Sequence, residues 1–211
     1  MPQKKVSLVV GLGNPGKTYA ATRHNFGFMA LDKLADSFSI PLGKKKFNAL
    51  IGRGKIEGID VILAKPMDFM NRSGFPVHKI KQYFNISCKD ILVVHDDIDL
   101  AFGTLRIKQK GGSGGHKGIE SLIEFLGAHD FSRLRIGIGR GIGSSGKDID
   151  ITDYVLNKFS YNEKRNLDQI IIKAQEAIIT ILCKGITYAM NCFNNKKIMF
   201  DTTLVENKGL V

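Results

Sequence analysis

Hydrophobic residues gather into short uninterrupted or alternating runs along much of the chain, which is the pattern of β-strands. Between two of these runs lies the dipeptide Glu57-Gly58, which favours a tight hairpin turn. The expected strands are residues 6–10, 48–56, 59–64, 91–94, 105–108 and 134–138, with 105–108 at an edge of the sheet. The chain is therefore expected to build one sheet from six strands.

Other segments carry apolar residues three or four positions apart, which predicts helices with one buried face. Ser73 is expected to cap one of them, and Ser160 with Glu163 forms a capping box for a long one. The expected helices are residues 28–38, 73–84, 119–126 and 160–182. They fall between or after the strands, so the pattern predicts an α/β fold: a mixed twisted β-sheet flanked by helices.

No repeat and no linker divides the 211 residues, which suffice for one sizeable core. We expect a single domain over residues 1–195 and a loosely ordered tail over 196–211. Within the domain, residues 111–115 are expected to form a mobile glycine loop. A second loop, rich in glycine and serine, is expected over 139–150.

The composition is typical of a soluble globular protein. Hydrophobic residues make up 43% and charged residues 24% of the chain. The most apolar run, residues 170–182, is interrupted by polar residues and falls short of the ~20 apolar residues that cross a bilayer. The chain begins without a signal-peptide pattern. Its 3 cysteines have no metal-ligand spacing, so free thiols in a reducing compartment are expected.

Basic residues exceed acidic ones by 31 to 20, giving a net charge of +11 and a pI near 9.6. This excess favours a polyanionic partner, with nucleic acid first. A lysine-rich surface that serves only solubility explains the same excess. No zinc-finger spacing and no basic-aromatic repeat accompanies the charge, so composition leaves both interpretations open.

Polar residues with catalytic potential follow the first expected strand. That strand breaks into a glycine-rich turn over residues 11–16, and Thr22-Arg23-His24-Asn25 comes shortly after. A histidine has an unperturbed pKa near ~6.5, so His24 is a candidate general base. The alternative is a polar loop that merely closes the strand.

Two further strand ends carry matching chemistry. Asp96 follows the strand at 91–94, and ligands in open α/β sheets bind beyond the carboxyl ends of strands. Asp96 would hold the His24 ring in one tautomer and raise its basicity. Alternatively, Asp96, Asp97 and Asp99 cap a turn or bind a divalent cation, although their spacing is unconvincing for a metal. Asn71 offers an amide suited to an oxyanion, or else it caps a helix.

The turn at residues 11–16 also fits the dinucleotide-binding pattern G-x-G-x-x-G. That motif requires the last glycine to open a helix, and an acidic residue ~20 positions further on at a second strand end. Here the Thr22–Asn25 segment intervenes, and Asp32 and Asp36 fall inside the expected helix. A Rossmann-type oxidoreductase is therefore disfavoured.

Taken in order, these motifs resemble those of bacterial-type peptidyl-tRNA hydrolases, and the resemblance covers roughly residues 6–190. Each motif alone is moderate evidence, whereas the ordered set is highly specific. The matching pieces are residues 11–16, Tyr19, Thr22-Arg23-His24-Asn25-x-Gly27, Phe69-Met70-Asn71-x-Ser73-Gly74, His95-Asp96 with Asp99-Leu100, Gly114-Gly115-His116 and residues 133–139.

The resemblance implies an enzyme that hydrolyses the ester between a peptide, or an N-blocked amino acid, and the 3′ end of tRNA. Such an enzyme recycles tRNA from aborted translation, as a cytoplasmic monomer without metal or cofactor. His24 would be the base, Asp96 would keep it basic, and Asn71 would bind substrate and place its carbonyl. Asn14 would distinguish a blocked from a free amine, and we infer that its amide carbonyl accepts from a substrate N–H.

The resemblance also implies that Tyr19, Phe69 and His116 line the substrate cleft. Lys108 and Arg135 would grip tRNA phosphates, or else they are ordinary surface charge. Lys117 departs from the family, which has asparagine there. A lysine only donates hydrogen bonds, and its charge near His24 would oppose protonation of the base, so this departure concerns catalytic efficiency. The alternative is a non-catalytic RNA-binding relative with the same fold.

Overall fold

The computed structural model describes residues 6–141 and 150–194. One seven-stranded sheet runs through the molecule in the order β2-β3-β4-β1-β5-β7-β6. The central strands β1, β4, β5 and β7 pair in parallel, whereas β2, β3 and β6 pair antiparallel. The strands are β1 Ser7–Gly11, β2 Lys44–Lys46, β3 Ala49–Ile56, β4 Ile59–Pro66, β5 Ile91–Asp97, β6 Leu105–Lys108 and β7 Ser132–Gly137.

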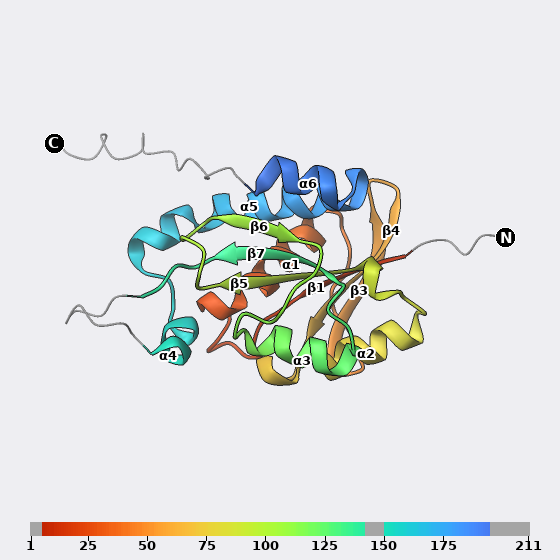
Figure 1. Cartoon of the computed structure of the whole chain (residues 1–211), viewed down its shortest axis with the longest axis horizontal. Helices are drawn as coiled ribbons and strands as arrows, with labels where there is room; N and C mark the ends of the chain where they lie inside the picture. The colour runs from red at the N-terminus through yellow and green to blue at the C-terminus, as the bar shows by residue number, and fades with distance from the viewer. Residues whose placement is uncertain (1–5, 142–149, 195–211) are drawn as a thin grey trace.

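Helices cover both faces of this sheet, α5 and α6 on one side and α2 and α3 on the other (Figure 1). Residues of β1 alternate between two cores, as the pleat of a strand requires: Val9 packs with α1 and α5, and Leu8 and Val10 pack with α2 and α3. The helices are α1 Phe26–Ser37, α2 Gly74–Tyr83, α3 Lys117–Leu126, α4 Ile151–Leu156, α5 Tyr161–Lys184 and α6 Ile186–Phe193. Short 3₁₀ turns are η1 Arg23–Asn25, η2 Met70–Arg72 and η3 Cys88–Asp90.

The expected α/β fold is confirmed, with all six expected strands and four expected helices. Two boundaries differ in ways that affect the candidate chemistry: β5 continues to Asp97, and α3 begins at Lys117. The sequence pattern missed β2, α4 and α6. Strand β2 consists of three lysines and has no apolar alternation, and α4 and α6 are too short to establish a period.

The two expected helix caps have different outcomes. The capping box at Ser160 and Glu163 is present. Ser73 stands at the start of α2 but makes no side-chain cap; its hydroxyl donates instead to the Met70 carbonyl at 2.8 Å. The local η2 turn offers that acceptor before the helix begins, so this expectation was wrong.

Three further expectations concern the ends and surface of the chain. The tail over 196–211 and most of the loop over 139–150 lie outside the described residues. The three cysteines are free thiols, as expected. Among the described residues, no helix combines the length and the apolar character that crossing a membrane requires.

Glycine at position 27 lets the start of α1 approach the ends of two strands. A Cβ there would lie 2.3 Å from the Val94 carbonyl oxygen and 2.4 Å from the Leu12 backbone nitrogen. No side chain fits at such distances. The close approach brings η1, directly before α1, over the carboxyl ends of β1 and β5, which is where the candidate histidine is needed.

Candidate active site

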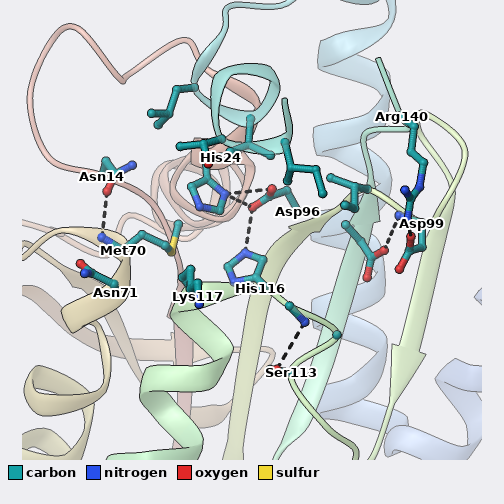
Figure 2. Close-up of a pocket in the computed structure, with 18 of the residues that line it drawn as sticks. Asn14, His24, Met70, Asn71, Asp96, Asp99, Ser113, His116, Lys117 and Arg140 are labelled. Atoms are coloured by element: carbon teal, nitrogen blue, oxygen red, sulfur yellow. Dashed lines mark hydrogen bonds and ion pairs between the residues drawn. The ribbon is translucent and has the colours of Figure 1, made fainter. Parts of the chain in front are cut away.

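A cleft of about 520 Å³ opens at the carboxyl ends of β1 and β5 (Figure 2). Its walls come from η1, η2, the glycine loop before α3, and α4. Several acids line it, and the cations beside them are mostly already paired: Arg140 with Asp99 at 2.6 Å, and Lys117 with Glu120 at 3.0 Å. The cleft thus combines a polar floor with an apolar wall that includes Val155 and Leu156.

The two neighbours of His24 in the chain fix its backbone. Arg23 is buried, pairs with Glu163 at 2.6 Å and donates to backbone carbonyls around residue 157. Asn25 exchanges two hydrogen bonds with the Asn14 backbone, accepting its N–H at 2.8 Å and donating to its carbonyl at 2.9 Å. His24 therefore projects from a rigid turn tied to both α5 and the first glycine turn. The role of Asn25 was missed at the sequence level.

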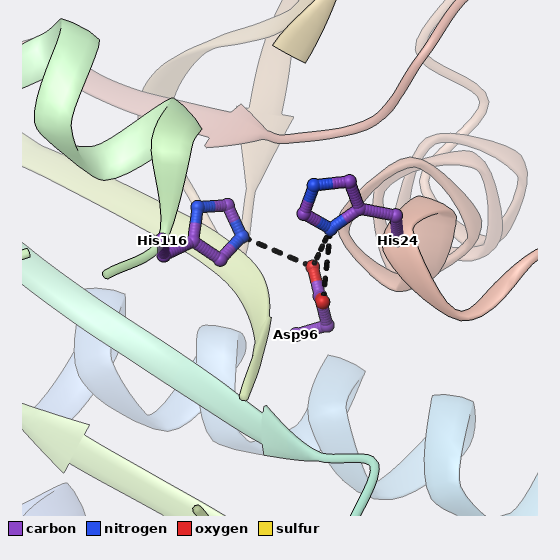
Figure 3. A group of neighbouring side chains, drawn as sticks. All are labelled: His24, Asp96 and His116. Carbon is purple, nitrogen blue, oxygen red and sulfur yellow. Dashed lines mark hydrogen bonds and ion pairs between the residues drawn. The ribbon is translucent and has the colours of Figure 1, made fainter. Parts of the chain in front are cut away.

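Asp96 holds one nitrogen of the His24 ring. Both carboxylate oxygens lie 2.9 Å from His24 Nδ1, and Asp96 is only 1% exposed. An ionised carboxylate only accepts hydrogen bonds, so Nδ1 carries a proton and Nε2 is the basic nitrogen. Figure 3 shows Nε2 turned away from Asp96. The predicted pairing is confirmed, although Asp96 lies within β5 rather than beyond it.

The environment shifts the pKa of both partners. Burial alone would lower the pKa of His24, but the charge of Asp96 and the hydrogen bond to it outweigh burial and raise that pKa. Burial would likewise raise the pKa of Asp96, yet the charges of His24 and His116 and their hydrogen bonds hold it far below the usual range. Asp96 is therefore ionised throughout the physiological range.

His116 approaches the same carboxylate from the opposite side (Figure 3). It caps α3, because its Nδ1 accepts the N–H groups of Gly118 at 3.1 Å and Ile119 at 3.3 Å. That acceptor role leaves the ring proton on Nε2, which donates to Asp96 Oδ1 at 3.1 Å. The resemblance implied a substrate-lining residue. His116 does line the cleft, but its two ring nitrogens are both engaged within the protein.

His95 supports this arrangement from beneath the cleft. Its Nδ1 lies 2.7 Å from the Asp96 carbonyl oxygen, and its ring packs edge-on against His116 with centroids 4.6 Å apart. Burial, followed by the neighbouring His116 and the Arg133 charge, lowers the pKa of His95 well below its ordinary value. His95 is therefore a neutral packing partner. Its place in the motif was visible in the sequence, but its contact with His116 was not.

His24, Asp96 and His116 offer one ligand atom each within 4.8 Å of one another, a set that in composition could hold a transition metal. The hydrogen bonds argue against that use. Both ring nitrogens that face Asp96 carry protons, and metal binding would have to displace them. Moving the His116 proton to Nδ1 would break the cap of α3. The donor set thus fits a hydrogen-bonded cluster better than a metal centre.

The two asparagines border the cleft near η2. Asn14 is buried, and its side-chain oxygen accepts the Met70 N–H at 2.8 Å. That bond orients the amide, and its Nδ2 group has no hydrogen bond among the described residues. Asn71 is exposed on η2, lines the cleft, and does not cap α2. The helix-capping alternative for Asn71 is thereby disfavoured.

The remaining residues implied by the resemblance lie partly in the cleft and partly outside it. Phe69 lines the cleft, whereas Tyr19 lies in the turn before η1 and is not among the lining residues. Lys117 lies on the rim: it is the first residue of α3, its side chain is 68% exposed, and it pairs with Glu120. The helix expected over 119–126 begins two residues earlier and includes Lys117, because His116 caps it.

The two expected phosphate-binding residues lie in different surroundings. Arg135 forms an ion pair with Asp97 and is only 16% exposed. Lys108 is exposed at the end of the edge strand β6 and has no ion pair among the described residues. Lys108 is therefore available to bind a polyanion, whereas Arg135 is held in its ion pair with Asp97.

Comparison with known proteins gives one consistent result. A family model described as peptidyl-tRNA hydrolase matches residues 8–201. A peptidyl-tRNA hydrolase from Syntrophotalea carbinolica is 42% identical over 191 residues, 90% of this chain and 98% of the relative. One from Bacillus subtilis is 42% identical over 189 residues, 90% of this chain and 98% of the relative. The crystal structure of peptidyl-tRNA hydrolase from Acinetobacter baumannii has a TM-score of 0.83 and 40% identity, covering 93% of this chain and 98% of its own.

Proposed function

We propose a mechanism for this chain, which belongs to the peptidyl-tRNA hydrolase family and hydrolyses peptidyl-tRNA: His24 activates a water molecule that attacks the ester carbonyl. One observation carries the proposal. Asp96 occupies Nδ1 of His24, so Nε2 is left as the proton acceptor at the cleft. The raised pKa strengthens that nitrogen as a base.

The reaction needs only water as co-reactant. His24 Nε2 takes a proton as the water oxygen bonds to the ester carbonyl carbon, giving a tetrahedral oxyanion. When the carbon–oxygen bond to the ribose breaks, protonated His24 returns the proton to the departing 3′ oxygen. The products are a peptide carboxylic acid and tRNA. Asp96 stabilises the imidazolium that exists between these steps.

Asn14 and Asn71 are the groups proposed to place the substrate. The Asn14 oxygen is engaged by Met70, which supports a donor role for its Nδ2 group in addition to acceptance through the remaining lone pair. A blocked amine carries an acyl carbonyl that accepts from such a donor, and a free ammonium does not. Asn71, exposed on η2, would donate to the ester carbonyl or the oxyanion.

The nucleic-acid arm of the substrate accounts for the positive charge of the chain. Lys108 remains the better of the two expected phosphate contacts, since Arg135 is paired with Asp97. We retain a cytoplasmic monomer as our expectation. A non-catalytic RNA-binding relative is disfavoured, because the hydrogen-bonded pair of His24 and Asp96 is intact and borders an open cleft.

The test is release of tRNA from N-blocked aminoacyl-tRNA, with the free-amine form as the comparison substrate. The blocked form should be hydrolysed and the free form spared. His24→Ala should lose about 10²–10⁴-fold in rate, the usual effect of removing a general base, while tRNA binding stays intact. His129→Ala, an exposed histidine outside the cleft, is the matched control. Normal turnover by His24→Ala would disprove the proposed base.

A further inference from the structure

Strand β2 forms the outer edge of the sheet and consists of Lys44, Lys45 and Lys46. None of the three has an ion pair among the described residues. Lysines on an edge strand discourage strand addition by another chain, and that role alone would explain them. The groups packed against these lysines require a second explanation.

Aromatic rings lie directly beside Lys46, the last of these lysines. The Lys46 ammonium is 3.3 Å from the centroid of Tyr83 and 4.9 Å from that of Phe47, and the Tyr83 and Phe47 rings are 5.3 Å apart. Tyr83 is 60% exposed even so. An edge protected by charge needs no exposed tyrosine. A cation beside an exposed aromatic ring is instead typical of surfaces that bind single-stranded nucleic acid, and here Lys46 lies over one face of Tyr83.

The turn that follows β2 holds an aromatic residue in an uncommon backbone conformation. Phe47 has φ of 53° and Asn48 has φ of 55°. Lys46 pairs with Ala49, so residues 47 and 48 form a two-residue hairpin loop, which requires positive φ at both; asparagine suits such a position, whereas a bulky phenylalanine is unusual there. The turn is held by Asn48, whose carbonyl accepts the Met67 N–H at 2.7 Å and whose side chain donates to Asp68 at 3.3 Å.

The position of the turn links it to the catalytic cleft. Ala49 pairs with Pro66, so the turn lies at the carboxyl end of β4. His24 lies on the same side of the sheet, where the parallel strands end. A groove of about 520 Å³ beside the turn includes Lys46, Met67 and Asp68 in its lining. The chain then continues into Phe69, which lines the catalytic cleft. Three strand spacings separate β2 from β1, roughly 14 Å.

We propose that Lys44, Lys45, Lys46, Phe47 and Tyr83, here called the lysine–aromatic patch, bind the unpaired nucleotides of the RNA that precede the scissile 3′ end. The inference rests on the proposed function, since it assigns a path to the RNA arm of that substrate. Phosphates contact the lysines, and a base stacks on Tyr83. Among the described residues that line the groove, Asp68 is the one acid, and its carboxylate accepts a hydrogen bond from Asn48.

The decisive experiment compares two triple variants of equal charge. Lys44→Gln/Lys45→Gln/Lys46→Gln removes the patch, and Lys55→Gln/Lys89→Gln/Lys184→Gln removes exposed lysines elsewhere. Binding is measured against salt with deacylated tRNA, and with tRNA trimmed of its unpaired 3′ nucleotides. The patch variant should flatten the log–log salt slope by roughly 0.7 per lost contact on intact tRNA. It should bind trimmed tRNA as the wild type does.

Tyr83 provides a test that is independent of charge. Tyr83→Leu should weaken binding of intact tRNA by about fivefold or more through lost stacking, and Tyr83→Phe should restore it. Tyr161→Leu, another exposed tyrosine, is the control. All variants should retain the wild-type kcat on N-blocked aminoacyl-adenosine, which lacks the upstream nucleotides and so reports that the catalytic site is folded.

The outcomes separate the two levels of the proposal. Equal weakening by both triple variants, or equal loss on intact and trimmed tRNA, would overturn the patch. Wild-type binding by the patch variant together with aggregation would favour the edge-protection role. If the wild-type protein binds intact tRNA through the patch but hydrolyses no blocked substrate, the patch stands and the proposed function fails.

Discussion

The cluster of His24, Asp96 and His116 and the lysine–aromatic patch both lie on the side of the sheet where the parallel strands end, but their side chains are held in different ways. In the cluster each ring nitrogen near Asp96 has an assigned proton, because backbone N–H groups and a buried carboxylate leave no alternative. In the patch, the side chains are exposed or half-buried, and they are held by a cation–ring contact and a tilted contact between two rings. In the cluster, each buried hydrogen bond determines which ring nitrogen carries a proton. In the patch, each exposed charge contributes a small amount to the binding free energy, and these contributions add.

Asp96→Asn should produce the largest effect among these comparisons after removal of His24 itself. Loss of the carboxylate removes the ion that stabilises the imidazolium, so turnover should fall by about 10²–10⁴-fold. Asp96→Ala should lose less than His24→Ala, because water still reaches the ring. Steady-state rates on N-blocked aminoacyl-tRNA measure both, and near-normal turnover in either variant would contradict the role of the carboxylate.

The same variant gives a pH prediction with a defined sign. His24 works as a base only when unprotonated, so the wild-type rate should rise with pH through a pKa that the Asp96 charge raises above the ordinary histidine value. Without Asp96 the raising effects vanish and burial, which lowers the pKa, remains. The acidic limb of the kcat–pH profile in Asp96→Asn should therefore move to lower pH. A limb that stays in place would assign the titration to another group.

His116 separates structure from chemistry within the cluster. His116→Asn keeps a side chain that caps helices well but loses the Nε2–H donated to Asp96. His116→Ala loses both. We expect each to lower kcat about tenfold, the scale of a hydrogen bond to a charged group. Only the alanine variant should lose about 1 kcal/mol of unfolding free energy through the missing cap, as measured by urea denaturation.

Substitution of the two expected phosphate-binding residues should change tRNA binding by smaller amounts that depend on salt concentration. Lys108→Gln should weaken binding of deacylated tRNA and reduce the log–log salt slope by roughly 0.7–0.9. Arg135→Gln should change the slope less, since Arg135 is paired with Asp97. Fluorescence titrations across a salt series measure both slopes. A larger slope change in Arg135→Gln would show that its ion pair opens to phosphate.

Lys117→Asn should have the smallest effect. The substitution restores the amide of the family pattern, which both donates and accepts, so we expect a gain of turnover on short blocked substrates. The gain should be at most a few-fold, because Lys117 is exposed and paired with Glu120 rather than directed at His24. Glu120→Gln is the control for loss of that pair. Slower single-turnover cleavage by Lys117→Asn would make the lysine an adapted part of the site.

The sequence by itself determined the α/β class, six strands and four helices, and it predicted the pairing of His24 with Asp96. These features follow from local rules: apolar periodicity selects strands and helices, and catalytic residue types follow strand ends in motif order. The capping box at Ser160 is equally local, since the residues that satisfy each other are three positions apart.

Only the tertiary structure decided which proton sits on which nitrogen and which cation remains available. His116 donates to Asp96 through Nε2 because its Nδ1 accepts backbone N–H groups at the start of α3. Arg135 is less available to a phosphate because it forms an ion pair with Asp97. The partner of His116 in that bond, Asp96, is distant in sequence and is brought close by strand order. A hydrogen bond depends on distances and directions of a few tenths of an ångström, which residue spacing alone does not specify.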